Sequence, residues 1–424
     1  MPPTELNVQR DPSCEDDFDD ASLSANDARV RILNNVAVIS GEHRVPVRDS
    51  LRRYLSRDIH SPVNVPQQTN SAMDGYAIAG NDLPSTGTAR LDVLGTALAG
   101  HPFEGVFRPG GAVRIMTGAP MPEGCDTVLM QEHVEHNGDH ITLDHHHKIG
   151  QHVRAAGEDL KAGQQVLPAA HLMNPADLGL VASLGIGEVH VHRRLRVAYF
   201  STGDELRSIG EPLGVGQIYD SNRYTLYGML ERINAEIIDM GVVGDSKQAV
   251  ADAFAAASQM ADVVISSGGV SVGEADYIKG VLADLGQVGF WKVAMKPGRP
   301  LAFGLLGDAA FFGLPGNPVS VMVTFYQFVQ PALTKMAGGV VRQWLTCEAT
   351  VTETLKKRPG RVEFQRAAMS RDHRGRLLVT PTGDQGSGIL RSMSSADCLI
   401  VLPIDSAGVD AGSVVEIQPF SDFM

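Results

Sequence analysis

The feature that most constrains this chain is an alternation of apolar, β-prone runs with helical patterns over residues 195–343. Predicted strands fall at residues 195–200, 236–240, 263–266, 289–294, 301–305 and 310–313. Predicted helices fall at 220–233, 247–259, near 275–284, and from Pro318 onward. Strands that alternate with helices of this length indicate parallel βαβ units, with helices on both faces of one sheet. We therefore expect a doubly wound α/β domain over residues 195–343.

The segments on either side of this region follow a different pattern. Residues 61–163 contain short alternating runs at 90–94, 112–116 and 127–131, separated by Gly, Pro, Asn and Asp turns, which predicts a small β-rich domain. Residues 344–424 return to short strands and predict a small β barrel or sandwich. Between these regions, residues 28–61 suggest one or two strands and a helix near 49–55, and residues 174–184 suggest a helix that ends at Gly185.

Net charge excludes two classes of partner. The 424 residues carry 49 acids against 36 Lys and Arg, a formal charge of −13, which disfavours nucleic acid and anionic membranes. Four well-separated cysteines without a CxxC pair favour a reducing cytoplasm. The start of the chain does not resemble a secretory signal, and no apolar run is long enough to span a bilayer. Residues 1–26 are acidic and predict a disordered tail, and a functional acidic arm is the alternative interpretation.

Glycine-rich loops follow three of the predicted strands. Residues 261–276 run from a buried strand through Gly268, Gly269 and Gly273 into a helix. Glycines allow close backbone approach to a ligand, and a helix N-terminus favours an anion, although a tight structural turn would have the same appearance. Residues 201–205 and 313–318 follow two other strands. We expect the three loops to open along one sheet edge, around a ligand that carries phosphates.

Charged side chains accompany these loops. Acids occur at Asp204, Glu205, Asp245 and Asp276. Carboxylates beside a phosphate need a hard cation between them, and Mg²⁺ is typically held by one or two carboxylates plus phosphates. Helix caps and turns are the alternative roles for these acids. Residues 290–300 add the cations Lys292, Lys296 and Arg299. On an extended strand Lys292 and Lys296 would share a face and form an oxyanion pocket, unless they are simply solvated.

Taken together, the motifs resemble the molybdopterin molybdenumtransferase (MoeA) family, to which the C-terminal part of gephyrin is related. In the family's order, the chain contains NSAMDGYA (70–77), RIMTGAP (114–120), GED (157–159), STGDEL (201–206), SSGGVSVGEADY (266–277), KPG (296–298) and GLPGNPVS (313–320). The similarity covers residues 28–420. Gln68-Thr69 before NSAMDGYA, Asp384 before QGS, and the acidic tail depart from the family pattern.

The resemblance implies an α/β plus β, multidomain architecture. Its parts would be an elongated connector domain (27–60 and 164–194), a β-rich insert domain (61–163), a doubly wound molybdopterin-binding α/β domain (195–343) and a C-terminal β barrel (344–424). It also implies a homodimer.

By the same resemblance, the site residues fall into four groups. The implied catalytic residues are Asp74, Asp159 and Glu205. The implied substrate-binding residues are Thr117, Ser201, Thr202, Gly203, Gly268, Gly269, Ser271, Gly273, Pro315, Gly316, Asn317 and Pro318. Molybdate would be bound by Lys292, Lys296, Arg366 and Ser387, and Mg²⁺ by Asp245 and Asp276.

The implied reaction is Mg²⁺-dependent insertion of molybdate into adenylated molybdopterin, with release of AMP. Implied partners include the preceding adenylyltransferase and molybdoenzyme chaperones. Two alternatives remain open at this point. One is a non-catalytic, pterin-binding scaffold of the gephyrin type, and the other is a nucleotide transferase or hydrolase built on the same α/β domain.

Overall fold

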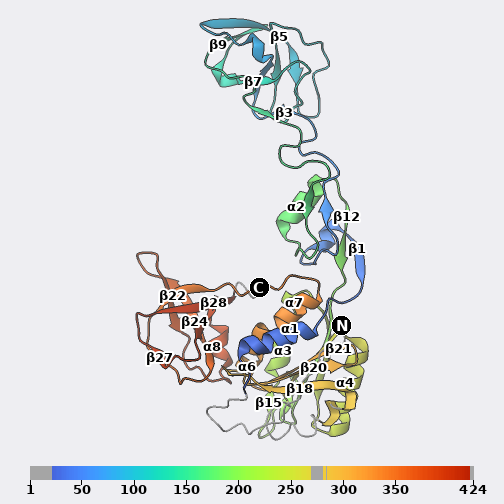
Figure 1. Ribbon diagram of the computed structural model, residues 1–424, viewed down its shortest axis with the longest axis vertical. Helices are drawn as coiled ribbons and strands as arrows, with labels where there is room; N and C mark the ends of the chain where they lie inside the picture. Colours follow the sequence, from blue (N-terminus) through green and yellow to red (C-terminus); the bar gives the residue numbers. More distant parts are fainter. Residues whose placement is uncertain (1–21, 269–279, 283, 421–424) are drawn as a thin grey trace.

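The structure is a computed structural model that describes residues 22–268, 280–282 and 284–420. The chain forms a long molecule with the β-rich domain at one end (Figure 1). At the other end the α/β domain and the C-terminal domain lie side by side, and a slender connector joins the two ends. In the described part of the chain, no helix is long and apolar enough to cross a membrane.

The β-rich domain is built on a six-stranded sheet in the order β7-β4-β6-β5-β9-β8. Its elements are β3 (Asn70–Ser71), β4 (Gly75–Ile78), η2 (Gly80–Asp82), β5 (Thr88–Ala97), β6 (Gly111–Ile115), β7 (Thr127–Met130), η3 (Gln131–His133), β8 (Glu135–Asn137), β9 (His140–Asp144) and β10 (Val153–Arg154). Because side chains alternate along a strand, Tyr76 and Ile78 pack on one face and Ala77 on the other. The three strands predicted for this domain are confirmed.

The connector is a small unit formed by two distant stretches of chain. Strand β1 (Glu42–Pro46) pairs with β12 (Glu188–His192), and β2 (Ile59–His60) pairs with β11 (Gln165–Leu167). Helix α2 (Pro175–Ser183) begins at a capping box between Asn174 and Asp177, which confirms the predicted helix at 174–184. The helix expected near 49–55 is wrong, because only one 3₁₀ turn, η1 (Val47–Ser50), forms there.

Helix α1 (Ala25–Asn35) was not predicted, because residues 28–61 were expected to contain strands and a later helix. Ser24 caps the helix, with its hydroxyl oxygen accepting the Asp27 amide at 3.0 Å. Only Ala28 and Ile32 are buried, so the apolar periodicity is too weak to reveal a helix. Both side chains join the core of the α/β domain.

The α/β domain contains a six-stranded sheet in the order β16-β13-β17-β21-β20-β18. Its strands are β13 (Arg196–Thr202), β16 (Glu236–Val243), β17 (Val263–Ser267), β18 (Gly286–Lys292), β20 (Pro300–Leu306) and β21 (Ala309–Leu314), and a short ribbon joins β14 (Leu206–Arg207) and β15 (Ile218–Tyr219). The first four strands in this order are parallel, as predicted. Strands β18, β20 and β21 are antiparallel neighbours, which the predicted βαβ units did not include, because the described connections between them contain no crossover helix.

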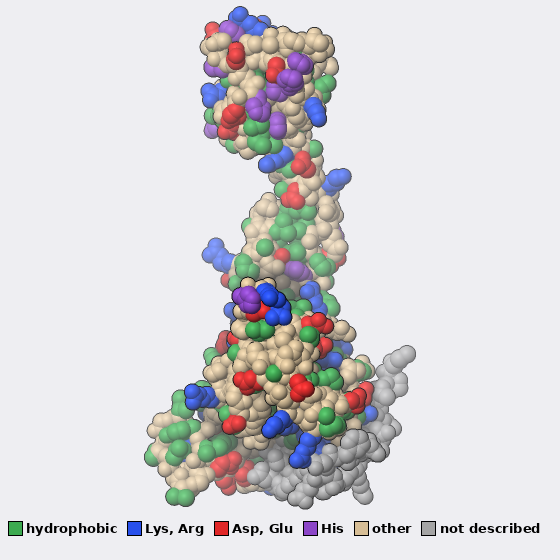
Figure 2. Space-filling model, turned by 90° about the vertical axis from the view of Figure 1, so that its left-hand side faces the viewer, with side chains coloured by type: hydrophobic (Ala, Val, Ile, Leu, Met, Phe, Trp, Pro, Cys, Tyr) green, Lys and Arg blue, Asp and Glu red, His purple; other side chains and the backbone are tan. Residues whose placement is uncertain are grey.

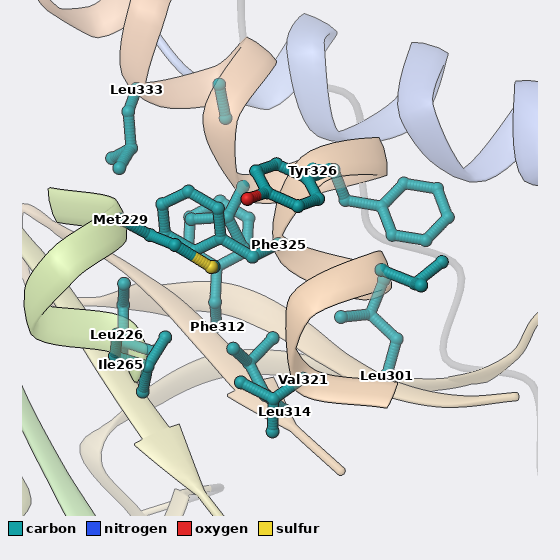
Figure 3. Close-up of a cluster of buried hydrophobic side chains, with 14 of the residues drawn as sticks. Leu226, Met229, Ile265, Leu301, Phe312, Leu314, Val321, Phe325, Tyr326 and Leu333 are labelled. Atoms are coloured by element: carbon teal, nitrogen blue, oxygen red, sulfur yellow. The ribbon is translucent and has the colours of Figure 1, made fainter. Parts of the chain in front are cut away.

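Helices cover both faces of this sheet, as the alternating pattern predicted. One face packs against α3 (Ser221–Arg232), α6 (Pro318–Thr324), the π-helical segment η4 (Phe325–Val329) and α7 (Gln330–Met336). Figure 3 shows this core, in which Met229 of α3 lies beside Phe312 of β21 and Phe325 of η4. The other face packs against α4 (Lys247–Met260), mainly through Phe254.

The C-terminal domain is a closed five-stranded barrel. Its elements are β22 (Cys347–Val351), β23 (Leu355–Lys356), β24 (Val362–Arg371), β25 (Leu377–Pro381), α8 (Leu390–Ser394), β26 (Cys398–Leu402), β27 (Gly408–Val409) and β28 (Val414–Pro419). The ring closes because β24 pairs with both β25 and β26. Strand β19 (Met295–Lys296) of the α/β region pairs with β24 and joins the two domains.

Candidate functional site

The carboxyl ends of three adjacent parallel strands carry the predicted glycine loops. Strands β13, β17 and β21 are neighbours in the sheet, so residues 201–205, Gly268 and residues 315–318 open along one edge, as predicted. Ser201 and Thr202 form the buried end of β13, whereas Gly316 and Asn317 are exposed before α6. Gly269, Ser271, Gly273 and Asp276 lie outside the described residues. The edge is a place where an extended anionic ligand could meet several backbone amides.

Close backbone approach explains one of the glycines. Gly268 has φ +94°, and a Cβ atom there would lie 2.6 Å from the carbonyl oxygen of Thr202. A side chain at this position would therefore push the β17 loop away from β13. Only glycine lets the ends of the two strands lie this close together.

Asn222, in the first turn of α3, also belongs to this edge although the sequence reasoning missed it. Its amide nitrogen donates to the Ser267 hydroxyl at 2.8 Å and to the Gly316 carbonyl at 2.7 Å, so it joins the ends of β17 and β21. The Asn222 Oδ1, Ser201 Oγ and Thr202 Oγ1 atoms are buried and have no hydrogen-bond partner among the described residues. Unpaired polar atoms are costly to bury, so their grouping beside the loops indicates a ligand-binding edge.

Two of the predicted acids lie together at the adjoining strand ends. The Asp245 carboxylate accepts the Asp204 amide at 3.1 Å, and the Asp204 carboxylate accepts the Asp245 amide at 3.2 Å. This pair fits Mg²⁺, which typically takes one or two carboxylates and completes its shell with phosphate oxygens and water. No group of three or more His, Cys, Asp or Glu side chains that could hold a metal occurs among residues 22–268, 280–282 and 284–420. Asp276, the other predicted ligand, lies outside them.

A cationic cavity of about 590 Å³ lies between the α/β domain and the barrel. Lys296, Arg299 and Arg361 line it together with the hydroxyl-bearing Ser320 and Ser387. The Ser387 carbonyl accepts the Val319 amide at 3.0 Å, so the cavity adjoins the start of α6 and the 315–318 loop. Two of the four predicted molybdate residues, Lys296 and Ser387, are thus brought into one cavity.

A second cavity of about 380 Å³ adjoins the first and shares Lys296 and Arg361 with it. Its other lining residues are Lys356, Lys357, Arg358 and Glu363. The cations of the 356–361 stretch were not singled out from the sequence. They lie about sixty positions after Lys296, and only the β19–β24 pairing brings them beside it.

Lys292 and Lys296 do not share one extended strand, contrary to the prediction. Strand β18 ends at Lys292, and the chain leaves the α/β sheet before Lys296 pairs with Glu363 of β24. Lys292 lines neither cavity. Residues four apart share a face only on a single extended strand. Here residues 293–294 lie between two strands that belong to different sheets, so the prediction fails.

Arg366, predicted to bind molybdate, lies beneath the loop that precedes Ser387. Its side chain is fully buried, and its guanidinium donates to the Ser392 hydroxyl and to the carbonyls of Asp384, Gln385 and Gly386. It lines neither cavity. The observed contacts make Arg366 a residue that shapes the loop before Ser387.

The three β-domain motifs that contain Asp74, Thr117 and Asp159, residues to which the resemblance gives catalytic or substrate-binding roles, meet at the connector end of that domain. Strand β3 pairs with β10, and the Gly118 amide donates to the Ser71 carbonyl at 2.8 Å. The Asp74 carboxylate accepts both the amide and the hydroxyl of Thr117 at 2.7 Å, and these bonds lower the pKa of Asp74. Asp159 follows in the nearby 157–160 turn, and its amide donates to the Val65 carbonyl at 3.0 Å. All three side chains are exposed.

The β-domain residues and the α/β loops do not meet within one chain. They lie in domains at opposite ends of the molecule, on either side of the connector (Figure 1). Figure 2 shows the same narrow waist from another side, with histidine side chains gathered on the surface of the β-rich domain. Glu205 belongs to the α/β group, since its carboxylate folds back beside Gly203.

Fold and site together define a multidomain protein whose doubly wound α/β domain has an anion-binding sheet edge next to a cationic cavity. Three family models match the chain: the MoeA N-terminal region (domains I and II) at residues 23–185, a probable molybdopterin-binding domain at 198–335, and the MoeA C-terminal region (domain IV) at 348–420. The chain is 45% identical to the molybdopterin molybdenumtransferase of Haemophilus influenzae over 95% of this chain and 100% of that protein.

Other relatives agree with this similarity. The Nostoc molybdopterin molybdenumtransferase is 36% identical over 86% of this chain and 85% of its own length. The crystal structure of a molybdopterin biosynthesis MoeA protein from Pyrococcus horikoshii has a TM-score of 0.82, at 29% identity, and the match covers 94% of this chain and 100% of that one. The chain belongs to the molybdopterin molybdenumtransferase (MoeA) family, whose members act as transferases.

Proposed function

We propose that this protein inserts molybdate into adenylated molybdopterin, with the help of Mg²⁺ and with release of AMP. The carrying observation is the 590 Å³ cavity in which Lys296, Arg299 and Arg361 surround hydroxyl groups. In a chain of net charge −13, such a gathering of cations needs a specific anionic ligand to account for it. A tetrahedral dianion neutralises this positive charge, and its oxygens accept the hydrogen bonds that the ammonium, guanidinium and hydroxyl groups of the cavity donate.

The pterin nucleotide would lie along the adjoining sheet edge. The buried hydroxyls of Ser201 and Thr202, which have no partner among the described residues, would supply donors for phosphate oxygens there. Because Ser387 is held against the start of α6, molybdate bound near it would lie close to a ligand on the 315–318 loop. The residues of the chain therefore act mainly by holding the two substrates next to each other.

Asp204 and Asp245 are the described residues that would hold Mg²⁺, with Asp276 as the further predicted ligand. When bound, Mg²⁺ would neutralise charge on the pyrophosphate from which AMP departs. Glu205, on the same loop as Asp204, would orient water or accept a proton near that bond. Asp74 and Asp159 are proposed to serve the same reaction from the β-rich domain.

A homodimer follows from this assignment. Asp74, Thr117 and Asp159 lie at the far end of the connector from the α/β loops (Figure 1). A two-fold dimer can bring the β-rich domain of one subunit over the α/β domain of its partner. We propose such a dimer, working in the cytoplasm, that receives its substrate from the preceding adenylyltransferase and passes its product to molybdoenzyme chaperones.

A non-catalytic scaffold of the gephyrin type is the weaker alternative. Gephyrin of Dictyostelium is 32% identical over 91% of this chain, but this chain covers only 60% of that protein. The presence of Asp204 and Asp245 as a paired site for a hard cation favours an enzyme, since a scaffold does not require one.

The deciding experiment is a turnover assay with adenylated molybdopterin, molybdate and Mg²⁺. AMP release that depends on molybdate and Mg²⁺, together with formation of the molybdenum cofactor, is the expected result. Binding of the pterin nucleotide without AMP release would favour the scaffold. AMP release without any molybdate requirement would favour a simple nucleotide hydrolase.

A further inference from the structure

A buried carboxylate lies in the wall of the smaller cationic cavity. Glu363 is 5% exposed, and the residues that line this cavity with it are Lys296, Lys356, Lys357, Arg358 and Arg361. Among the described residues that line either cavity, it is the one acid. A carboxylate repels the anions that the surrounding cations attract, so its presence at this point calls for a specific role.

The position of Glu363 is fixed by the backbone and by a neighbouring amide. It pairs with Lys296 across the β19–β24 junction, where the Val362 amide donates to the Ala294 carbonyl at 3.0 Å. The Gln365 side-chain amide donates to Glu363 Oε1 at 3.0 Å and to the Lys356 carbonyl at 3.2 Å. The carboxylate therefore has little freedom to turn away from the cavity.

The same oxygen of Glu363 accepts the Lys296 ammonium at 3.1 Å. The two partners differ in exposure, with side-chain values of 51% for Lys296 and 6% for Glu363. A long lysine side chain that reaches into solvent has many conformations, and a fixed, buried acceptor selects one of them. The selected conformation places Lys296 in the wall shared by both cavities.

The charge of Glu363 also acts on the other cations. Burial lowers the pKa of Lys357, and the Glu363 charge opposes this effect. Burial also lowers the pKa of Arg366, and the charge of Glu363 again opposes this effect. The field of this carboxylate thus reaches both the smaller cavity and the arginine that shapes the Ser387 loop.

We infer that Glu363 is a positioning and affinity-setting residue, which holds the Lys296 ammonium at the boundary of the two cavities and weakens their hold on oxyanions. This inference rests on the proposed function in one respect, namely that the cavities receive a tetrahedral dianion. A set of cations without a counter-charge would bind any small dianion tightly and release it slowly. With Glu363 present, the dianion stays exchangeable and can be transferred to the second substrate.

The test is calorimetric binding of molybdate, and separately of sulfate, to the full-length protein and to Glu363→Gln. Glutamine keeps an oxygen that accepts from Lys296 and removes only the charge. We expect the Kd of both oxyanions to fall, by roughly three- to tenfold for the loss of one nearby charge in a solvated cavity. Glu416→Gln, an exposed acid on β28 that lines neither cavity, is the matched control and should leave both Kd values unchanged.

A double-mutant comparison separates positioning from a general charge effect. In a Lys296→Met background, the change caused by Glu363→Gln should shrink, because the two residues act as a pair. In turnover, Glu363→Gln should lower both the KM for molybdate and kcat. If Glu363 only held the β19–β24 junction together, Glu363→Gln would lower the melting temperature and leave the Kd of the oxyanions and the KM for molybdate unaltered.

Unchanged or weaker oxyanion binding in folded Glu363→Gln would overturn the inference. The proposed function fails separately, if the wild-type protein binds molybdate and sulfate but releases no AMP. In that case the ratio of the oxyanion Kd values of the wild-type protein and of Glu363→Gln still decides the role of Glu363. A wild-type protein that binds neither oxyanion would overturn both.

Discussion

Lys296 is the residue on which the oxyanion site depends most directly, since it lines both cavities and contacts Glu363. Lys296→Ala should raise the KM for molybdate by roughly 10- to 100-fold, the worth of a charge-assisted hydrogen bond, and the KM for the pterin nucleotide much less. Lys292→Ala is the matched comparison, because Lys292 lines neither cavity. An equal rise in both KM values for Lys296→Ala would point to phosphate binding instead.

The pKa of Asp74 gives a second prediction at the scale of a residue. Hydrogen bonds from the Thr117 amide and hydroxyl lower its pKa, so the ionised form persists to lower pH than for an ordinary aspartate. The two hydrogen bonds to ionised Asp74 stabilise the folded protein above the ordinary pKa of an aspartate, and this stabilisation is lost as the pH falls through the lowered pKa. Thr117→Val removes only the hydroxyl donor, so the pKa of Asp74 should rise.

The measurement is the pH dependence of kcat/KM. If ionised Asp74 serves the reaction, its acid limb should move to higher pH in Thr117→Val. Thr142→Val on β9, where Thr142 pairs with Arg90 and not with the Asp74 loop, should leave the profile in place. A matching profile in Thr117→Val and wild type would remove ionised Asp74 from the rate-determining chemistry.

At the scale of the elements, sequence patterns were most successful where the core imposes a regular period. The helix expected at 220–233 is α3 (Ser221–Arg232), with Asp220 as its cap and Ile233 at its end. Helix α1 escaped prediction because only two of its side chains are buried. The antiparallel arrangement of β18, β20 and β21 also could not be read from apolar runs, which look alike in parallel and antiparallel buried strands.

The candidate site also divides into parts that the sequence could predict and parts that it could not. The three loops at one sheet edge follow from strand order, and so they were predictable. The 356–361 cations and the buried position of Arg366 depend on how β19 joins the barrel, which no local pattern encodes. Asn222 carried a weak signal, a polar residue just inside a capped helix, that sequence reasoning alone could not separate from ordinary solvation.

The contact between β13 and β17 gives a prediction for the sheet edge. Gly268→Ala would combine a left-handed φ with a Cβ 2.6 Å from the Thr202 carbonyl, and it should destabilise the fold by about 1–3 kcal/mol. Gly138→Ala, at φ +62° with open space around it, is the control for backbone strain alone and should cost less. Denaturant unfolding measures both, and equal losses would show that the close approach to Thr202 is unimportant.

For the whole molecule, the first question is where the folded chain begins. The 1–26 segment was expected to be a disordered tail, yet Leu23 bridges Val293 and Ser24 caps α1. Deleting residues 1–20 should leave the melting temperature unchanged, whereas deleting residues 1–24 should lower it, since a lost cap costs about 1 kcal/mol. Thermal unfolding of both truncations checks this. A drop of several degrees for the shorter deletion would show that the acidic segment docks on the fold.

The elongated shape makes subunit complementation the decisive test of assembly. If each active site takes Asp74 from one subunit and Asp245 from its partner, Asp74→Asn and Asp245→Asn homodimers should each be inactive. After subunit exchange, a heterodimer has one site with both lesions and one with neither. Random pairing makes half of the dimers mixed, so recovery should approach about a quarter of wild-type activity, by the two-fold symmetry of the dimer.

Exchange must be shown independently, by mass spectrometry of differently tagged subunits. The control mixes Asp74→Asn with Thr117→Val/Asp74→Asn, whose lesions fall on the same domain and leave every site of every dimer damaged, so no activity should return. Demonstrated exchange without recovery in the main experiment would place each site within a single subunit. The connector would then have to bend far enough for the β-rich domain to reach its own α/β domain, and the arrangement in Figure 1 would be one of two states of the molecule.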